Sequence, residues 1–310
     1  MGTRFFLHIN QKEDGGSYSG EVIQRMGGVA RNHADAIARL GCDSIFLSAV
    51  GNDPNADFFH RECQHFDISR VQKIENSPTC TYLSMNFHGN VKYGITTCEP
   101  LLQKIETDLI MKNQDAIQNA EYVLIDGNLP VDVVSKAMEI CSKFEKRVWF
   151  EPTDIKKVGK IFASGQVDLI HAASPNANEF LEWARYCGVS VGAEAIATPN
   201  NVLEVVKQKG DRLFLPNMEI LVVSLAQNGT AVIYRDAQNH VQYLTLPPAI
   251  NPSEVVSVSG AGDSFNSGFI AGIVHGKSLD DSLKIAQKCA NLTLQSTLAV
   301  SDKINTSLLI

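Results

Sequence analysis

Short apolar runs alternate with amphipathic segments between residues 107 and 186 of this chain. Apolar runs bounded by turn residues are typical of buried strands, and apolar residues recurring every three or four positions are typical of helices. Their alternation predicts an α/β fold in which helices cover both faces of a parallel sheet. The expected elements are helix 107–119, strand 122–125, helix 131–143, strand 147–150, helix 155–162, strand 169–171 and helix 176–186.

The flanking parts of the chain add two features to this pattern. Residues 1–20 join a short apolar piece, Phe5 to Ile9, to a loop-like stretch and predict no confident element. Residues 79–97 have the pattern of a β-hairpin, which would form either a small lid over a cleft or an extension of the sheet. The other expected elements are helices 29–40, 55–66, 199–209, 262–275 and 279–297 and strands 45–50, 220–224, 230–235 and 241–246.

The composition excludes several classes of protein. The net charge is −7, from 27 basic and 34 acidic residues without a basic run, which argues against binding to nucleic acid or a membrane surface. No stretch approaches a membrane span, and Phe5-Phe6-Leu7 is too short for a signal peptide. Seven scattered cysteines without a C-x-x-C pair predict neither a zinc site nor a disulfide framework, and a reducing cytoplasm suits them. We therefore expect a cytoplasmic protein with small-molecule partners.

The segment Ser259-Gly260-Ala261-Gly262-Asp263 joins an apolar, β-branched run to a helix that is expected from about residue 262. Small residues let backbone N–H groups approach an anion, and the helix N-terminus adds the positive end of its dipole. Asp263, in the first turn, can accept a proton from a hydroxyl that attacks a phosphorus atom. The segment thus predicts phosphoryl transfer to an alcohol. The alternative is a glycine-rich turn in which Asp263 only complements the helix dipole.

Other polar residues stand where predicted strands end or helices begin. Gly27 and Gly28 open a helix that carries Asn32 one turn in, and further polar side chains follow the strands at Asp126, Asn128, Glu151, Asn176 and Glu179. Ligands of open α/β sheets bind beyond the carboxyl ends of the strands, so one shared cleft is expected there. Each of these residues alone is equally explained as a helix cap, a turn former or a close-packing glycine. A nicotinamide dehydrogenase is excluded because Phe265 breaks the G-x-G-x-x-G fingerprint.

Three segments, taken in order, resemble the ribokinase-like family of sugar and nucleoside kinases, also called the phosphofructokinase-B type. They are Gly27-Gly28-Val29-Ala30-Arg31-Asn32, Pro175-Asn176-Ala177-Asn178-Glu179 and Gly260-Ala261-Gly262-Asp263. Within that family the chain is most similar to the pseudouridine kinases, through the first segment and through residues 126–130 and 150–153. The resemblance implies a single three-layer α/β/α kinase domain over residues 1–310, with a mostly parallel sheet and a small β lid at about residues 79–97.

The resemblance also implies roles for individual residues. Asp263 would be the catalytic base, and the amides of Gly260, Ala261 and Gly262 would hold the charge of the transferred phosphoryl group. The substrate would be bound by Gly27, Gly28, Asn32, Asn128 and Glu151. The nucleotide would be bound by Asn176, Ser224 and Gly229, with Glu179 serving Mg²⁺ through water.

Two departures from the family pattern affect these expectations. Ser257 stands where the family usually has an aspartate associated with a monovalent cation, so potassium activation is in doubt. By the same resemblance, we expect the family's first strand, with its substrate-binding aspartate, to belong before the start of this chain. Either Arg4 to Ile9 enters the sheet as a short substitute, or its neighbours expose unpaired backbone groups. In both cases we expect low stability and weak kinase activity for these 310 residues.

The resulting expectation is an ATP-dependent, Mg²⁺-requiring kinase that phosphorylates the 5′-hydroxyl of a nucleoside, with pseudouridine as the first candidate. Another acceptor, such as adenosine, ribose or fructose, is the alternative within the same class. An alternative from a different class is a nucleoside-binding protein with little catalytic activity. Pairing of two subunits through the lid is left open.

Overall fold

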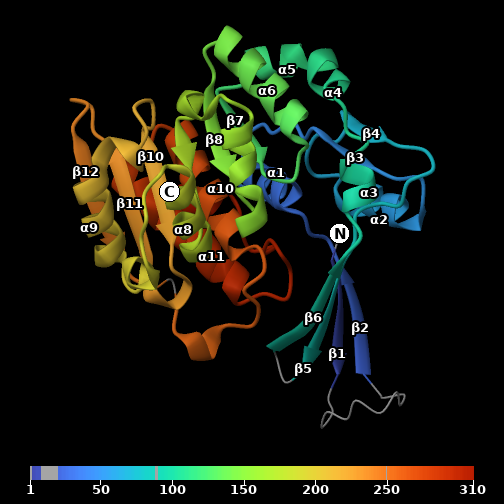
Figure 1. The fold of residues 1–310 in the computed structure, drawn as a ribbon. Helices are drawn as coiled ribbons and strands as arrows, with labels where there is room; N and C mark the ends of the chain where they lie inside the picture. Colours follow the sequence, from blue (N-terminus) through green and yellow to red (C-terminus); the bar gives the residue numbers. More distant parts are fainter. Residues whose placement is uncertain (1, 8–19, 88–89, 249) are drawn as a thin grey trace.

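The computed structural model describes residues 2–7, 20–87, 90–248 and 250–310, and its body is built on a six-stranded sheet (Figure 1). The strand order is β12-β11-β10-β9-β8-β7. Neighbouring strands from β7 to β10 are parallel, and β11 is antiparallel to both of its neighbours, β10 and β12, so the sheet is mostly parallel as predicted. The strands are β7 (Tyr122–Asp126), β8 (Arg147–Glu151), β9 (Ala172–Ala173), β10 (Ile220–Ser224), β11 (Thr230–Arg235) and β12 (Val241–Leu246).

Helices cover both faces of this sheet because its strands carry apolar side chains on both sides. Trp149 of β8 packs in a buried cluster with Phe269 and Leu283, which come from the helices on one face. The helices of that layer are α1 (Val29–Arg39), α10 (Ala261–Val274) and α11 (Leu279–Leu294). The next residue, Phe150, points to the opposite face, as the period of a strand requires.

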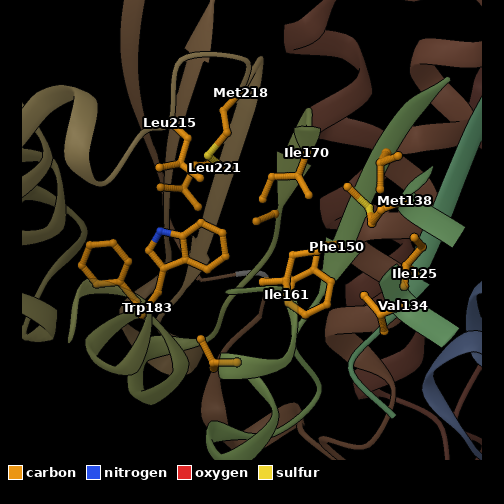
Figure 2. Packing of buried hydrophobic residues seen from close by; sticks show 14 of the residues in the cluster. Ile125, Val134, Met138, Phe150, Ile161, Ile170, Trp183, Leu215, Met218 and Leu221 are labelled. Carbon is orange, nitrogen blue, oxygen red and sulfur yellow. The ribbon is translucent and has the colours of Figure 1, made fainter. Parts of the chain in front are cut away.

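On that opposite face, Phe150 belongs to the largest buried cluster, together with Trp183 and Ile161 (Figure 2). The helices of this layer are α6 (Val131–Lys143), α7 (Gly159–Ala163), α8 (Ala177–Tyr186) and α9 (Pro199–Lys209). Together the two helical layers and the sheet form the predicted three-layer α/β/α arrangement. The carboxyl ends of β7, β8, β9 and β10 therefore meet at one edge of the sheet, where ligand sites of such folds lie.

Several predicted elements differ in detail from the observed ones. The expected helix 107–119 is two short helices, because the side chain of Asn113 donates to the Leu109 carbonyl (2.7 Å) and accepts from Arg70 (2.8 Å) at the break. The expected strand 169–171 is a 3-10 turn, Val167–Leu169, followed by the two-residue β9. The remaining short helices are α2 (Pro54–Glu62), α3 (Glu99–Leu102), α4 (Asp108–Lys112) and α5 (Gln114–Asn119).

A four-stranded sheet extends away from the body (Figure 1). We call it the projecting sheet; its order is β2-β1-β5-β6, with β1 (Gly2–Leu7), β2 (Gly20–Arg25), β5 (Tyr82–Phe87) and β6 (Asn90–Thr96). β5 and β6 form the predicted antiparallel hairpin. The expectation of no element at the start of the chain is wrong for residues 2–7, because β1 pairs in parallel with β5 and antiparallel with β2. The loop-like stretch expected before residue 20 and part of the hairpin turn lie outside the described residues.

The placement of β1 also decides between the two possibilities for the start of the chain. Residues 4–7 pair within the projecting sheet, so the expectation that Arg4 to Ile9 substitutes for a strand of the central sheet is wrong for them. Residues 8 and 9 lie outside the described part. The strands β3 (Ser48–Val50) and β4 (Val71–Lys73) form a parallel pair separate from the six-stranded sheet. Among the described residues, β7 and β3 are thus edge strands, and both contribute to the wall of one cavity.

In the part of the chain that the structure describes, no helix combines the length and the apolar character needed to cross a membrane.

Candidate active site

The three sequence motifs converge on one cavity of about 710 Å³ at the edge of the sheet. Seven of the residues predicted for the site line it: Gly27, Gly28, Asn32, Asn128, Asn176, Gly260 and Asp263. They come from the start of α1, the ends of β7 and β9, and the start of α10. The predicted clustering of polar residues beyond the carboxyl ends of the strands is present in the structure.

The start of α10 has the geometry of an anion-binding site. Gly260 is its N-cap residue and adopts a left-handed conformation, with φ of 77°. A Cβ atom at Gly260 would lie 1.8 Å from the Ala299 carbonyl oxygen, so only glycine fits. The first backbone N–H groups of a helix lack partners within the helix, and Gly260 brings this end of α10 to the cavity. The Ala261 N–H bonds the Val258 carbonyl at 3.4 Å. Ala261 and Gly262 complete this first turn but are not themselves among the lining residues.

Asp263 is the acidic residue of that first turn, and its environment suits a proton acceptor. Its Oδ2 atom accepts a hydrogen bond from the Asn32 side-chain amide at 2.5 Å. Burial raises the pKa of Asp263 to about 6, and the hydrogen bond from Asn32 limits the rise. A carboxylate with a pKa close to neutrality is deprotonated at physiological pH and yet basic enough to take a proton from an attacking hydroxyl.

The orientation of the Asn32 amide is set by a buried ion-pair network. The guanidinium of Arg31 donates to Asn32 Oδ1 and forms an ion pair with Asp35 at 2.6 Å. Asp35 in turn pairs with Arg39 (2.6 Å) and His65 (2.6 Å). Because Arg31 donates to the amide oxygen of Asn32, the NH₂ group of Asn32 faces Asp263. Sequence reasoning identified Asn32 but missed this network, since its partners are assembled only by folding.

His33 is a further neighbour of Asp263 that sequence reasoning missed. Its Nε2 atom lies 4.0 Å from Asp263 Oδ1, and its Nδ1 atom shares a hydrogen bond with Ser267 Oγ at 2.9 Å. Burial lowers the pKa of His33 to about 3, so the ring is neutral beside the carboxylate. Nε2 has no hydrogen-bond partner among the described residues. Its position directly after Asn32 was the only available signal in the sequence.

The end of β7 forms the wall opposite α10. Asp126 accepts hydrogen bonds from the backbone N–H of Ala30 (3.3 Å) and of Asn128 (2.9 Å), which ties β7 to the start of α1. Asn128 Oδ1 accepts from Lys157 Nζ at 2.5 Å. Asp126, Asn128 and Lys157 all line the cavity. From the sequence, Asp126 was predicted only as a polar residue at the end of a strand, and Lys157 was not predicted to belong to the site.

Glu151 lies beneath the cavity rather than in its wall. Its Oε2 atom accepts hydrogen bonds from Ser174 Oγ and from Asn266 Nδ2 (2.8 Å), and the residue is 7% exposed. Burial raises the pKa of Glu151 well above its ordinary value, and the nearby charge of Asp263 adds to the rise. Glu151, predicted to bind the substrate, therefore does not line the cavity and instead holds residues beneath it.

Four residues predicted for the nucleotide side meet at the ends of β9 and β10. Asn176 and Glu179 form a capping box at the start of α8, and Asn176 bridges to Ser224. The backbone of Gly229 accepts from the Leu225 N–H at 2.8 Å and closes the following turn. Ala226 in this turn has φ of 50°, a left-handed conformation at the position where the family resemblance leads one to expect glycine. Of the four, only Asn176 lines the cavity.

The described part of the site offers few protein ligands for a divalent cation. Within residues 2–7, 20–87, 90–248 and 250–310, no three His, Cys, Asp or Glu side chains cluster closely enough to hold a metal alone. Burial raises the pKa of Glu179 and so disfavours its charged form. A cation bound nearby would favour the charged form and lower this pKa. Mg²⁺ at phosphate sites is commonly held by one or two carboxylates, substrate phosphates and water. A single carboxylate beside the nucleotide-side residues fits that mode of binding and does not form a protein cage.

Known proteins resemble this chain over nearly its whole length. A pseudouridine-metabolizing bifunctional protein of Schizosaccharomyces pombe is 26% identical over 97% of this chain, which spans 45% of that protein. The pseudouridine kinase of Arabidopsis thaliana is 21% identical, over 91% of this chain and 85% of its own length. Among solved structures, Arabidopsis thaliana ribokinase complexed with ribose and ATP has a TM-score of 0.76 at 20% identity, covering 99% of this chain and 95% of that one. A nucleoside kinase of Methanocaldococcus jannaschii has a TM-score of 0.73 at 17% identity, covering 99% and 93%.

The ribokinase-like fold and the match to a family of carbohydrate kinases define a phosphotransferase that acts on a hydroxyl acceptor. Residues 5–306 match the pfkB family of carbohydrate kinases. The chain belongs to this family.

Proposed function

We propose that the chain transfers the γ-phosphoryl group of ATP to the 5′-hydroxyl of a nucleoside, with pseudouridine as the first candidate. The observation that carries the proposal is Asp263, held by Asn32 in the cavity wall with a pKa raised to about 6, in the first turn of α10. Similarity to the pseudouridine kinase of Arabidopsis thaliana, and to that of Escherichia coli at 24% identity over 90% of this chain, supports the choice of acceptor.

In the proposed reaction, the oxygen of the acceptor hydroxyl attacks the γ-phosphorus while Asp263 accepts the proton of that hydroxyl. The new P–O bond forms as the bond to the β-phosphate oxygen breaks, and ADP leaves. The N–H groups of Gly260, Ala261 and Gly262 stabilise the negative charge on the transferred group. Most of the rate acceleration comes from positioning and from charge stabilisation.

The remaining residues bind and orient the two substrates. Gly27, Gly28, Asn32 and Asn128 form the acceptor side, and Glu151 supports them from below. Asn176, Ser224 and Gly229 form the nucleotide side. When bound, Mg²⁺ neutralises phosphate charge, and Glu179 would hold it through water. The projecting sheet would close over the acceptor as a lid, and pairing of two copies through this sheet remains part of the proposal.

The surroundings in which the chain works are also part of the proposal. All seven cysteines are unpaired in the structure, which supports a reducing compartment such as the cytoplasm.

The proposal is tested by assaying ATP consumption and phosphorylated product with pseudouridine, uridine, adenosine and ribose in parallel. We expect the highest kcat/KM with pseudouridine. Higher kcat/KM with uridine, adenosine or ribose would replace the acceptor and keep the class of enzyme. Tight nucleoside binding by calorimetry without phosphorylated product would instead support a nucleoside-binding protein with little catalytic activity.

A further inference from the structure

Two cysteines flank the hairpin of the projecting sheet where it joins the body. Cys80 precedes β5 by two residues, and Cys98 follows β6 by two residues. In the register of this hairpin Tyr82 lies opposite Thr96, and the pairing continues to Thr81 and Thr97, whose N–H donates to the Thr81 carbonyl at 2.9 Å. Cys80 and Cys98 are the next residues beyond this pair, where the hairpin joins the body.

The local geometry suits a bond between the two sulfur atoms. The hairpin ends are held together next to the cysteines, because the Thr97 N–H donates to the Thr81 carbonyl and the Thr81 N–H donates to the Thr97 hydroxyl at 3.2 Å. Cys98 itself has left the strand conformation and is the N-cap residue of α3. The Cys80 thiol already points toward its partner, because it donates a hydrogen bond to the Cys98 carbonyl oxygen at 3.6 Å. The Cys80 sulfur therefore already lies against the residue with which it would form a disulfide.

Both cysteines are fixed to the body on their other side. Thr79, next to Cys80, bonds the Asp53 carboxylate through its N–H (2.8 Å) and its hydroxyl (2.6 Å). The carbonyl of Cys98 accepts from the N–H groups of Leu101 (3.1 Å) and Leu102 (3.0 Å) at the start of α3. The pair thus marks the point about which the hairpin would bend if the projecting sheet moves. Both side chains are partly exposed and line the cavity.

The two thiols also differ from the other cysteines in reactivity. The hydrogen bond from Cys80 lowers the pKa of the Cys98 thiol to about 6, with further contributions from the Thr96 side chain and the charge of Lys157. The pKa of Cys80 is raised by the same interaction. Burial raises the thiol pKa of the other five, Cys42, Cys63, Cys141, Cys187 and Cys289. A thiolate beside a second thiol is the arrangement of peroxide-sensitive pairs.

We propose that Cys80 and Cys98 form a reversible disulfide when the protein meets a peroxide, and that this bond fixes the base of the projecting sheet. The Cys98 thiolate attacks one peroxide oxygen, the O–O bond breaks, and hydrogen peroxide yields a sulfenic acid and, after protonation, water. The Cys80 sulfur then attacks the Cys98 sulfur, the S–O bond breaks, and the thiol proton leaves with the hydroxyl group as a second water. Two thiols and one peroxide thus give one disulfide and two waters, and a dithiol reductant reverses the change.

The bond is tested by treating the folded protein with hydrogen peroxide, blocking free thiols with an alkylating reagent and mapping peptides by mass spectrometry. We expect the wild type to lose two alkylable thiols, to show a Cys80–Cys98 cross-linked peptide, and to recover both thiols with dithiothreitol. Cys98→Ser should keep its remaining thiol, Cys80, free at the same dose. Cys80→Ser should accumulate a sulfenic acid at residue 98, trapped by dimedone, without the cross-link. Cys187, another partly exposed cysteine, follows the last residue of α8. Cys187→Ser is the matched control and should behave as the wild type.

Equal oxidation of the other five cysteines, or cross-linking that persists in Cys98→Ser, would overturn the proposal. The functional consequence rests on the proposed function and is measured separately. Oxidation should lower kinase turnover about tenfold in the wild type and in Cys187→Ser, reversibly, because a lid hinge that cannot bend slows closure and product release. Turnover that is unchanged by complete disulfide formation would refute the effect on the hinge. If the chain has no kinase activity, the thiol measurements still decide whether the bond forms.

Discussion

At the scale of single residues, the site depends on how α1 and α10 present their side chains to each other. Asn32 and Asp263 are distant in the chain and come together because the two helices pack side by side, with Ala36 and Ala271 in one buried cluster. Arg31 takes the amide oxygen of Asn32, which leaves the NH₂ group for Asp263. Asn32 thereby favours the charged form of the carboxylate, while burial opposes it.

This balance predicts the pH dependence of turnover. Turnover should rise as the pH increases through about 6, because Asp263 must be deprotonated to accept the hydroxyl proton. Asn32→Ala removes a hydrogen bond to the charged form and should move this acidic limb to higher pH by about one unit. The matched variant Asn128→Ala should weaken acceptor binding and leave the limb in place. The pH–rate profile of each variant provides the measurement, and an unmoved limb in Asn32→Ala would show that Asp263 is not the titrating group.

At the scale of elements, the turn before α10 is the part whose backbone geometry is most demanding. Gly260 adopts a left-handed conformation against the Ala299 carbonyl, whereas a Cβ at Gly262 meets no atom within 4 Å. Gly260→Ala should therefore lower the free energy of unfolding by about 2 to 4 kcal/mol through strain and overpacking. Gly262→Ala should be neutral or stabilising by up to about 1 kcal/mol, since alanine is favoured within helices. Urea unfolding distinguishes the two, and equal destabilisation would contradict this description of the turn.

The elements also show how far the sequence alone leads. The alternation from residue 107 to 186 predicts the sheet and its helices, since that signal is local and periodic. It fails at Asn113, where one side chain breaks a helix by bonding its own backbone, and at β9, where only two residues are paired. It also fails at β1, because a short apolar piece does not reveal that its partners are β2 and β5. In the same way, the motifs predict Asn32 and Asp263, but the network of Arg31, Asp35 and His65 exists only after folding.

At the scale of the whole molecule, buried acidic groups under the cavity connect the site to stability. Glu151 lies between the sheet and α10, bonded to Ser174 and Asn266, and burial keeps it protonated to a higher pH than an exposed glutamate. A group whose pKa is raised in the folded state contributes stability that is fully present below its unfolded pKa. That contribution is lost as the pH rises through the raised folded value.

Glu151→Gln should remove this dependence, because glutamine resembles the protonated side chain in shape. The free energy of unfolding of the wild type, relative to Glu151→Gln, should fall as the pH rises above the ordinary glutamate value of 4.5. Glu182→Gln, on the outer face of α8, is the control; its pKa is lowered by Arg185, so its contribution is lost instead as the pH falls. Urea unfolding at a series of pH values gives both differences. If the free energy of unfolding of the wild type, relative to Glu151→Gln, stays constant or rises with pH, then Glu151 is charged in the folded protein.

The claim that Asp263 takes the acceptor proton is tested most directly by comparing the wild type with Asp263→Asn in a single assay. Phosphorylated nucleoside is measured from Mg²⁺–ATP and pseudouridine at pH 7.5 or above, where the wild-type carboxylate is deprotonated according to its pKa of about 6. ATP binding and thermal unfolding are followed in parallel. We predict that Asp263→Asn retains folding and ATP binding while turnover falls by about two orders of magnitude or more. Turnover close to that of the wild type in a folded, ATP-binding Asp263→Asn protein would contradict it.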